Sequence, residues 1–250
     1  MTEKSEFESA STAGHYAAAR PDYPEELFDA LDELIGGGPG AAHVVDVAAG
    51  TGIAARRLAA RGARVTAVEL SAAMLGQLAA ASPGVAAVQG SGHALPLTAG
   101  CADLVSYAQA WHWMDRSLAG AEAKRVLRPG GVLAAWWNVD DYEVDWLREQ
   151  ADRISEVSPG WHRFQGTDTA VREGLLPGVE TRHFSYTWER TIPLETHLAN
   201  LASKSYIADL GDDMPAFLEG ERQILIKLFP DARITESYRT VLLAARTDED

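Results

Sequence analysis

The stretch VVDVAAGTG, residues 44–52, combines an apolar run, one carboxylate and a glycine-rich turn. The apolar run is typical of a buried β-strand, and the following Gly50-Thr51-Gly52 is typical of a loop that approaches a nucleotide. Asp46 stands inside the strand, four residues before Gly50. The identity of the ligand therefore depends on which nucleotide tolerates the carboxylate of Asp46 so close to the turn.

A nicotinamide dinucleotide is one candidate. The segment GTGIAA fits the loose G-x-G-x-x-A pattern, and Glu69 ends the second predicted strand, where an acid would hold a ribose. Asp46 argues against it, because it would repel a pyrophosphate laid on the turn in a partly desolvated site. S-adenosylmethionine (SAM) has an ammonium group and no phosphate, and it keeps a ribose diol for Glu69. These residues favour SAM.

His112, in QAWHWMD just past the fourth predicted strand, is the candidate catalytic base. Histidine titrates near neutral pH, and this strand end is expected to face the cleft. Methyl transfer is an in-line displacement, so a base is required only where the acceptor must lose a proton. The alternative is that His112 packs between Trp111 and Trp113 and only shapes the pocket.

Alternating strand and helix patterns predict an α/β fold, a Rossmann-like doubly wound sheet of seven strands. The predicted strands are 43–47, 64–69, 85–88, 102–107, 131–137, 181–192 and 237–246. The predicted helices are 24–35, 52–61, 72–81, 116–127, 141–157, 194–209 and 213–229, with a Gly- and Pro-rich loop after residue 157. We expect a single domain made of an N-terminal helical lid (1–36), a core (42–190 and 234–247) and a helical cap insertion (192–231).

Composition narrows the class of partner. A net charge of −14, without a block of basic residues, disfavours nucleic acid. The single cysteine, Cys101, excludes an internal disulfide and a cysteine metal cage. The acidic, polar start MTEKSEFESA is unlike a signal peptide, and no apolar run reaches membrane-spanning length. We expect a cytoplasmic protein that acts on a small molecule; a homo-oligomer is compatible with these features.

Several motifs occur in a characteristic order: D46-x-A-A-G50-T-G52, AVELS (67–71), GSGHALPL (90–97), YAQAWHWMD (107–115) and VLRPGG (126–131). In this order they resemble the class I SAM-dependent methyltransferases, and more narrowly the branch of trans-aconitate-type and related small-molecule methyltransferases. The resemblance covers about residues 16–138. SKSYI (203–207) and the closing YRTVLLAAR are similar to that branch in a less specific way.

The resemblance implies a set of residue roles. Asp46, Ala48, Gly50, Thr51 and Gly52 would form the turn at the methionine end of SAM, and Glu69 would bind the ribose hydroxyls. Leu70 and Met74 would pack on the adenine face, and Ser91, Gly92 and His93 would line its edge. Ala108 and Gln109 would lie beneath the sulfonium. Tyr16 and Arg20 belong to the segment that would close over the cofactor and hold its carboxylate. A backbone-capping role is the expected one for His93.

Two positions depart from the family pattern. Ala48 replaces a frequent glycine, so the turn is expected to start one residue later. Ser91 replaces an aspartate at the adenine amine, which exchanges a charge-assisted hydrogen bond for a neutral one at a cost of about 1 kcal/mol.

Aromatic residues are the candidates for the acceptor site. Trp111, Trp113 and Trp137 lie at or near strand ends, and Trp136 must face away from Trp137 because neighbours in a strand alternate. In the predicted cap, Tyr206 is a candidate substrate contact, and Lys204 is either a second contact or part of a solvated helix face. No histidine spacing predicts a metal site.

The sequence thus predicts a SAM-dependent methyltransferase for a small molecule, with an O, N, C or carboxylate acceptor, in secondary metabolism. A SAM-using enzyme that cyclises or eliminates the cofactor is an alternative. A nicotinamide oxidoreductase is disfavoured by Asp46 and by the lack of a Y-x-x-x-K pair. A nucleic-acid methyltransferase is disfavoured by charge and by the absence of a proline–proline–aromatic turn after the fourth strand.

Overall fold

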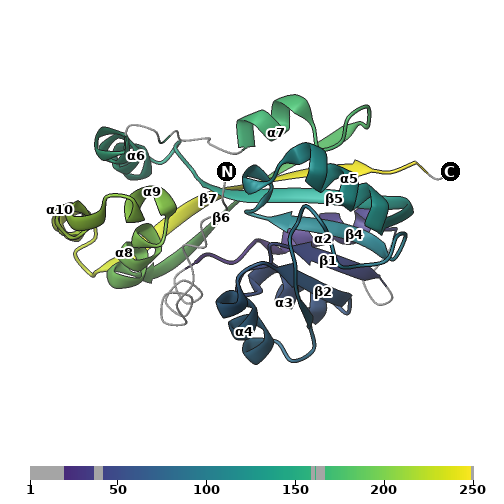
Figure 1. Cartoon of the computed structure of the whole chain (residues 1–250). Coiled ribbons are helices and arrows are strands. Elements are labelled where there is room, and N and C mark those ends of the chain that lie inside the picture. The colour runs from purple at the N-terminus through teal and green to yellow at the C-terminus, as the bar shows by residue number, and fades with distance from the viewer. Residues whose placement is uncertain (1–19, 37–41, 159–160, 162–166, 249–250) are drawn as a thin grey trace.

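The computed structural model describes residues 20–36, 42–158, 161 and 167–248. Its centre is a seven-stranded sheet of order β3-β2-β1-β4-β5-β7-β6 (Figure 1). The strands are β1 (His43–Val47), β2 (Arg64–Glu69), β3 (Ala86–Gln89), β4 (Ala102–Ala108), β5 (Leu127–Asp140), β6 (Thr181–Pro193) and β7 (Arg233–Arg246). Five strands are parallel, and β7 pairs antiparallel with both β5 and β6. The predicted α/β fold class is confirmed.

The strand order reverses between β1 and β4, which pair with each other. Open α/β sheets bind ligands outside the carboxyl ends of the strands at such a point, because the connections leave the strands in opposite directions there. All five residues of β1 are buried, as expected when helices cover both faces of a parallel sheet. The turn after β1 therefore lies at the position where this fold binds a ligand.

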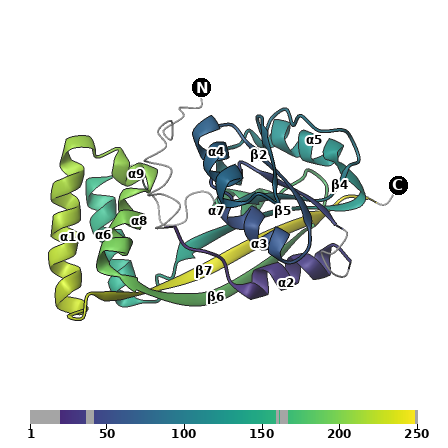
Figure 2. The same ribbon diagram turned by 90° about the horizontal axis from the view of Figure 1, so that it is seen from below.

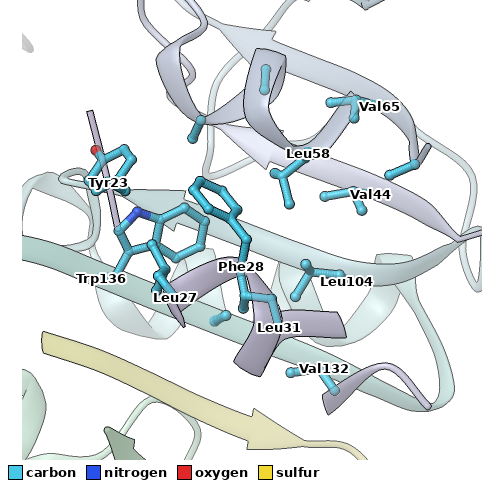
Figure 3. Close-up of a cluster of buried hydrophobic side chains, with 14 of the residues drawn as sticks. Tyr23, Leu27, Phe28, Leu31, Val44, Leu58, Val65, Leu104, Val132 and Trp136 are labelled. Atoms are coloured by element: carbon cyan, nitrogen blue, oxygen red, sulfur yellow. The ribbon is translucent and has the colours of Figure 1, made fainter. Parts of the chain in front are cut away.

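One face of the sheet is covered by α2 (Glu25–Leu34) and α3 (Ile53–Ala60). The apolar residues of α2 recur at helical spacing and point into the sheet, where Phe28 and Leu31 are buried (Figure 3). Trp136 of β5 belongs to this cluster, with Tyr23 packed edge-on against it at 5.9 Å between ring centroids. This packing fixes the chain just before α2 against the end of β5. α4 (Ala72–Ala81) lies on the same face as α3, where its Leu78 joins this cluster and the helix packs against β2 and β3.

The other face carries α5 (Arg116–Val126) and α7 (Thr167–Glu173). Trp137 is buried in this second cluster, so Trp136 and Trp137 do face opposite sides of the sheet, as predicted. A short 3-10 helix, η2 (Trp111–Trp113), joins β4 to α5. Asp115 caps α5 by accepting the N–H groups of Ser117 and Leu118.

A group of helices lies at one end of the molecule, where β6 and β7 run on past the end of β5 (Figure 2). Its members are α6 (Asp145–Val157), α8 (Leu194–Ala202), α9 (Ser205–Ala208) and α10 (Met214–Leu228). The helix predicted at 141–157 packs with α8–α10 through Ile154, Leu201 and Ile207, not on the sheet. We refer to these four helices as the helical lobe.

β5 and β7 start four residues earlier than predicted, at Leu127 and Arg233, and two further segments differ in kind. The loop predicted after residue 157 contains α7, whose Ala170 packs on the sheet near Leu175 and Leu176. The helix predicted over 194–209 is divided at Ser203 and Lys204, where the backbone of Lys204 is extended before α9 begins. Within the described ranges, no helix combines the length and apolar character required to cross a membrane.

Candidate cofactor and acceptor site

The turn after β1 uses the left-handed backbone conformation three times. Ala48 has φ 53°, Gly50 has φ 58° and Gly52 has φ 82°. Ala48 thus adopts the conformation for which glycine is preferred, at a cost on the order of 1 kcal/mol. The expectation that the turn starts one residue later is wrong, because the backbone of Ala48 already turns as a glycine would.

Three N–H groups of this turn are already engaged. Ala49 donates to the carbonyl of Val68, Gly50 to Oε2 of Glu69 at 2.8 Å, and Gly52 to the carbonyl of Ala49. A dinucleotide fold leaves such groups for its pyrophosphate. Their engagement agrees with the argument from Asp46 against a phosphate ligand.

Glu69 joins two parts of the site. Its Oε2 accepts from Gly50 and its Oε1 accepts from the N–H of Ser71 at 2.8 Å, while only 8% of the residue is exposed. Each carboxylate oxygen has two acceptor positions, so both oxygens keep capacity for a ribose hydroxyl. The backbone thus fixes the orientation that a diol contact requires.

Asp46 is fully buried beneath the turn and is not among the residues that line the pocket described below. Its Oδ1 accepts from the Ser106 hydroxyl at 2.8 Å, across the β1–β4 pairing that places the two residues side by side. Burial, assisted by the charge of Glu69, raises the pKa of Asp46 to about 7, although the hydrogen bond from Ser106 lowers it. The backbone N–H of Ala55, in the first turn of α3, lowers this pKa further.

A pocket of about 500 Å³, including its open mouth, lies over the turn. It collects six of the predicted cofactor residues: Arg20, Ala48, Gly50, Thr51, Ala108 and Gln109. Gln109 has φ 56°, and Ala48 and Gln109 are two of the three described non-glycine residues with positive φ. Strained backbone that the surrounding structure holds in place is typical of ligand sites.

Gln109 and Asn138 connect the end of β4 to the end of β5. The N–H of Gln109 donates to the carbonyl of Trp136 at 2.8 Å, and its Nε2 donates to the carbonyl of Asn138 at 3.3 Å. Asn138 Nδ2 in turn donates to the carbonyl of Asp22, beside the pocket residue Pro21. These bonds hold the segment before α2 over the carboxyl ends of β4 and β5.

The residues predicted around adenine lie further along the same edge of the sheet. Leu70 is 44% exposed, whereas Met74 is buried with its sulfur 3.8 Å from the point where a Cβ on Gly50 would lie. Gly92 packs so closely on Val47 and Met114 that a Cβ there would approach them to 3.0 and 2.9 Å. A residue larger than glycine would displace this loop from the end of β1.

Ser91 and His93 organise the same loop. The Ser91 hydroxyl accepts from the N–H of His93 at 3.2 Å, and Nε2 of His93 accepts from the N–H of Asp115 at 2.9 Å. The predicted capping role of His93 is confirmed by this second bond, which joins the loop to the start of α5.

Two polar atoms are buried at or beneath the turn, and one of them, on Thr51, faces the pocket. Oδ2 of Asp46 and Oγ1 of Thr51 have no hydrogen-bond partner within the part of the chain that the structure describes. A buried acceptor left unpaired costs about 1–3 kcal/mol, so such atoms are normally paired by water or ligand. Thr51 lines the pocket directly. Together with Glu69, these acceptors suit the amino-acid and ribose ends of SAM.

His112 and Trp137 form a hydrogen-bonded pair on the other side of Gln109. The indole Nε1 of Trp137 lies 3.0 Å from Nδ1 of His112. An indole N–H only donates, so Nδ1 accepts, and the proton of the neutral imidazole stands on Nε2. Desolvation lowers the pKa of His112 from 6.5 to about 4, although the residue is exposed to solvent on the rest of its surface. This direction disfavours a base near neutral pH, and the role of His112 stays a prediction.

The other candidate tryptophans differ in exposure. Trp111 is fully buried and packs edge-on against Tyr107 at 4.7 Å, because η2 turns its side chain back toward α5. The structure therefore does not place Trp111 on a cleft wall, contrary to expectation. Trp113 is 62% exposed, and its ring lies 5.0 Å from that of His112. Trp137 is 2% exposed and reaches the cleft side only through His112.

The predicted lid and cap residues meet near Arg20. Tyr16 lies outside the described residues. Nη2 of Arg20 donates to the carbonyl of Ser203 at 2.9 Å, which brings the pocket wall against the helical lobe. Lys204 forms an ion pair with Asp140 at 3.0 Å, so the solvated-face alternative for Lys204 is wrong. Tyr206 is partly buried against Trp161, with 5.4 Å between ring centroids.

The sequence did not predict three contacts of this region. They are the bond from Ser106 to Asp46, the bond from Asn138 to the backbone of Asp22, and the ion pair of Asp140 with Lys204. Ser106 is a polar residue inside the apolar segment ADLVSYA, and that break in the pattern is a signal that could have found it. No group of three or more His, Cys, Asp or Glu side chains in the described ranges is arranged to hold a metal ion.

Known proteins resemble this chain in sequence and fold. Residues 45–135 match a family model described as a methyltransferase domain. An uncharacterized methyltransferase of Mycobacterium tuberculosis is 43% identical over 193 residues, covering 71% of this chain and 77% of that protein. A malonyl-[acyl-carrier protein] O-methyltransferase of Pectobacterium atrosepticum is 34% identical over 131 residues, covering 52% of this chain and 47% of that protein.

Among solved structures, a proposed type II methyltransferase of Anaeromyxobacter dehalogenans superposes with a TM-score of 0.68 at 23% identity, covering 92% of this chain and 99% of that one. The fold and the turn after β1 are those of a class I enzyme whose cofactor is SAM. The chain belongs to the SAM-dependent methyltransferase family.

Proposed function

We propose that this methyltransferase transfers the methyl group of SAM to a small molecule and that it belongs to the trans-aconitate-type branch. The proposal is supported by the modest pocket between the turn after β1, the end of β4 and the segment before α2, and by the net charge of −14, which disfavours a polyanionic partner. The single observation that carries it is the turn at 48–52, in which the N–H groups of Ala49, Gly50 and Gly52 are engaged and the buried hydroxyl of Thr51 is unpaired.

In this proposal, Glu69 holds the ribose hydroxyls, Thr51 and the turn hold the amino-acid end, and Arg20 holds the carboxylate. Leu70 and Met74 pack on adenine, with Ser91 and Gly92 at its edge. SAM supplies a methyl carbon that its sulfonium has already activated for displacement. The protein orients the acceptor in line with that carbon and excludes water from it.

For His112 we propose hydrogen-bond donation through Nε2 instead of proton removal. The one lone pair of its neutral ring is engaged by Trp137, and a group with a pKa of about 4 is a weak base. Nε2–H can donate to an acceptor oxygen and orient it. A carboxylate acceptor, which needs no base, is compatible with this arrangement, and a phenol or carbon acid would require a base from another residue.

The size of the acceptor is a separate question. The relative from P. atrosepticum acts on a malonyl group held by a carrier protein. The region it shares with this chain covers half of the chain, so it supports the cofactor half of the site more than the helical lobe. We favour a free small molecule, because the start of α9 closes on the sheet beside the pocket. Lys204 pairs with Asp140 at the end of β5, and the pocket residue Arg20 donates to the carbonyl of Ser203.

The test is incubation of the purified protein with SAM labelled on its methyl group and a panel of small acids, phenols and amines. Appearance of S-adenosylhomocysteine together with a labelled small molecule supports the proposal. Methylthioadenosine without a methylated product would point to cyclisation or elimination of the cofactor. Transfer only to a carrier-bound acyl group would contradict the small-molecule part.

A further inference from the structure

The side-chain amide of Asn138 receives a chain of hydrogen bonds that crosses three strands. The indole N–H of Trp188, on β6, donates to Oγ1 of Thr240 at 2.9 Å, and that hydroxyl donates to Oδ1 of Asn138 at 2.6 Å. Thr240 is fully buried on β7 and is the register partner of Asn138 on β5. An indole nitrogen can only donate, so the hydroxyl proton of Thr240 is left for Asn138.

These bonds fix the orientation of the amide. Because Oδ1 of Asn138 accepts from Thr240, its Nδ2 faces the carbonyl of Asp22 and donates to it at 2.9 Å. With the amide reversed, Oδ1 would face that carbonyl and two acceptors would oppose each other. The contact from Asn138 to the backbone of Asp22 is therefore specified by residues of β6 and β7.

Asp22 belongs to a wall of the cofactor pocket. Its neighbours Arg20, Pro21 and Tyr23 line that pocket, and residues 20–23 lie outside the helices and strands. Neither a helical nor a sheet pattern of backbone hydrogen bonds therefore fixes this segment. Contacts from side chains have to hold it against the sheet.

The other contacts that join this wall to the core differ in kind. Tyr23 packs edge-on against Trp136 (Figure 3), which restrains the end of the segment next to α2. The carboxylate of Asp22 pairs with Arg57 of α3 at 2.8 Å, but the Asp22 side chain is 48% exposed. Exposed ion pairs contribute little, so the bond from Asn138 is the main restraint that holds the residues before Tyr23 to the sheet.

We propose that Asn138 is a positioning residue for the cofactor, which holds segment 20–23 as a wall that is formed before SAM binds. It acts through the carbonyl of Asp22 and not through contact with SAM. A wall that is already ordered need not be ordered during binding, which favours affinity and slows dissociation. The inference rests on the proposed function, since it concerns the wall of the same SAM pocket.

The experiment measures how fast S-adenosylhomocysteine leaves the protein, so it needs no knowledge of the acceptor. Dissociation is followed by surface plasmon resonance on immobilised wild type and Asn138→Ala. The variant lacks the donor to the Asp22 carbonyl. We expect dissociation to be at least about fivefold faster, the effect of losing one hydrogen bond that orders the wall.

Variants of Thr240 separate positioning from general stability. Thr240→Val leaves Asn138 in place but removes the hydroxyl that orients it, so dissociation should be faster, by less than in Asn138→Ala. Thr240→Ser keeps the hydroxyl and should behave as the wild type. Adding Thr240→Val to Asn138→Ala should have no further effect, because Thr240 acts only through the amide.

The matched control is Thr191→Val. It removes a hydroxyl that pairs with Thr235 across the same two strands, at an exposed position away from the pocket. The dissociation rate should be unchanged. Where Asn138→Ala fails to fold, the comparison of Thr240→Val with Thr240→Ser and Thr191→Val still decides the question.

A dissociation rate that is unchanged in both Asn138→Ala and Thr240→Val would overturn the positioning role, and so would effects that add in the double variant. Failure of the wild type to bind S-adenosylhomocysteine would instead contradict the proposed function. Hydrogen–deuterium exchange of the ligand-free protein then tests the wall itself. The N–H of Tyr23, which donates to Oδ1 of Asp22, should exchange faster in Asn138→Ala, and an unchanged rate would show that Asn138 does not order the segment.

Discussion

The indole nitrogen of Trp137 lies 3.0 Å from Nδ1 of His112, and this contact determines which form of the histidine faces the cleft. Trp137 comes from β5 and His112 from η2 after β4, so the bond joins the two strand ends between which an acceptor would lie. It leaves Nε2–H as the outward group of the ring. The buried position of Trp137 in the sheet therefore determines which nitrogen of His112 can contact the acceptor.

A first prediction concerns the titration of His112. Its pKa should lie well below 6.5 in the wild type, because desolvation lowers it and the bond from Trp137 favours the neutral ring. In Trp137→Phe that bond is lost and the pKa should rise. The measurement is an NMR titration of the histidine C2 protons, with the resonance of His112 assigned by its absence in His112→Gln. A wild-type pKa near 6.5, unchanged in Trp137→Phe, would contradict the geometry.

A second prediction concerns the stability of the ligand-free protein. Burial raises the pKa of Asp46 to about 7, so the folded state holds a proton that the unfolded state releases near pH 4. Stability should therefore fall as the pH rises from about 4 to about 7, and the full penalty should apply above pH 7. Asp46→Asn removes the ionisable group and should raise the free energy of unfolding at pH 8 by on the order of 3 kcal/mol.

Urea unfolding of Asp46→Asn and wild type at pH 5 and pH 8 gives the comparison. The gain should be clearly larger at pH 8 than at pH 5. A variant that is less stable than the wild type at pH 8 would show that the carboxylate of Asp46 is better stabilised than its buried environment indicates.

A third prediction concerns the strained turn. Ala48 has φ 53°, a conformation that costs a non-glycine residue about 1–2 kcal/mol, whereas glycine loses about 0.5–1 kcal/mol of chain entropy. Ala48→Gly should leave the unfolding free energy unchanged or raise it by up to about 1 kcal/mol. Ala121→Gly, at an exposed position in the middle of α5, should lower it by about 1 kcal/mol. Equal losses in both variants, measured by urea unfolding, would argue against the left-handed conformation of Ala48.

A fourth prediction concerns the base of the helical lobe. Glu236 is 2% exposed and accepts hydrogen bonds from Arg190, His197 and Tyr238, each at 2.6 Å. Although burial raises the pKa of Glu236, its bonds and charge partners lower it to about 2. Its stabilising contribution is complete above its usual pKa and is lost as the pH falls toward 2. Glu236→Gln leaves Arg190 without its counter-charge and should cost about 3–5 kcal/mol.

Thermal unfolding of Glu236→Gln tests this, with Glu195→Gln as the control. Glu195 pairs with Arg222 on the surface of the lobe, where the side chain of Glu195 is 69% exposed and that of Arg222 33%, so the loss of Glu195 should have a small effect. Similar shifts in the two variants would show that the buried network around Glu236 is not what anchors the lobe.

The strands and helices could be predicted from the sequence because the patterns that specify each element are local. The apolar run of β1, the capping residue Asp115 and the apolar spacing of α2 each predict an element without knowledge of its neighbours. The partner of Asp46 depends on the register between β1 and β4, and Lys204 meets Asp140 only after 64 residues of chain have folded back. The burial of Trp111 likewise follows from the direction of η2, which no periodicity records.

The most direct test of the account is whether the turn at 48–52 binds SAM and not a dinucleotide. Calorimetric titration with S-adenosylhomocysteine and with NAD should give binding of the first and none of the second. Glu69→Gln should weaken S-adenosylhomocysteine by about tenfold or more while the ligand-free protein stays folded, because a charged acceptor for the ribose is lost. Binding of NAD, or an affinity for S-adenosylhomocysteine that is unchanged in Glu69→Gln, would contradict it.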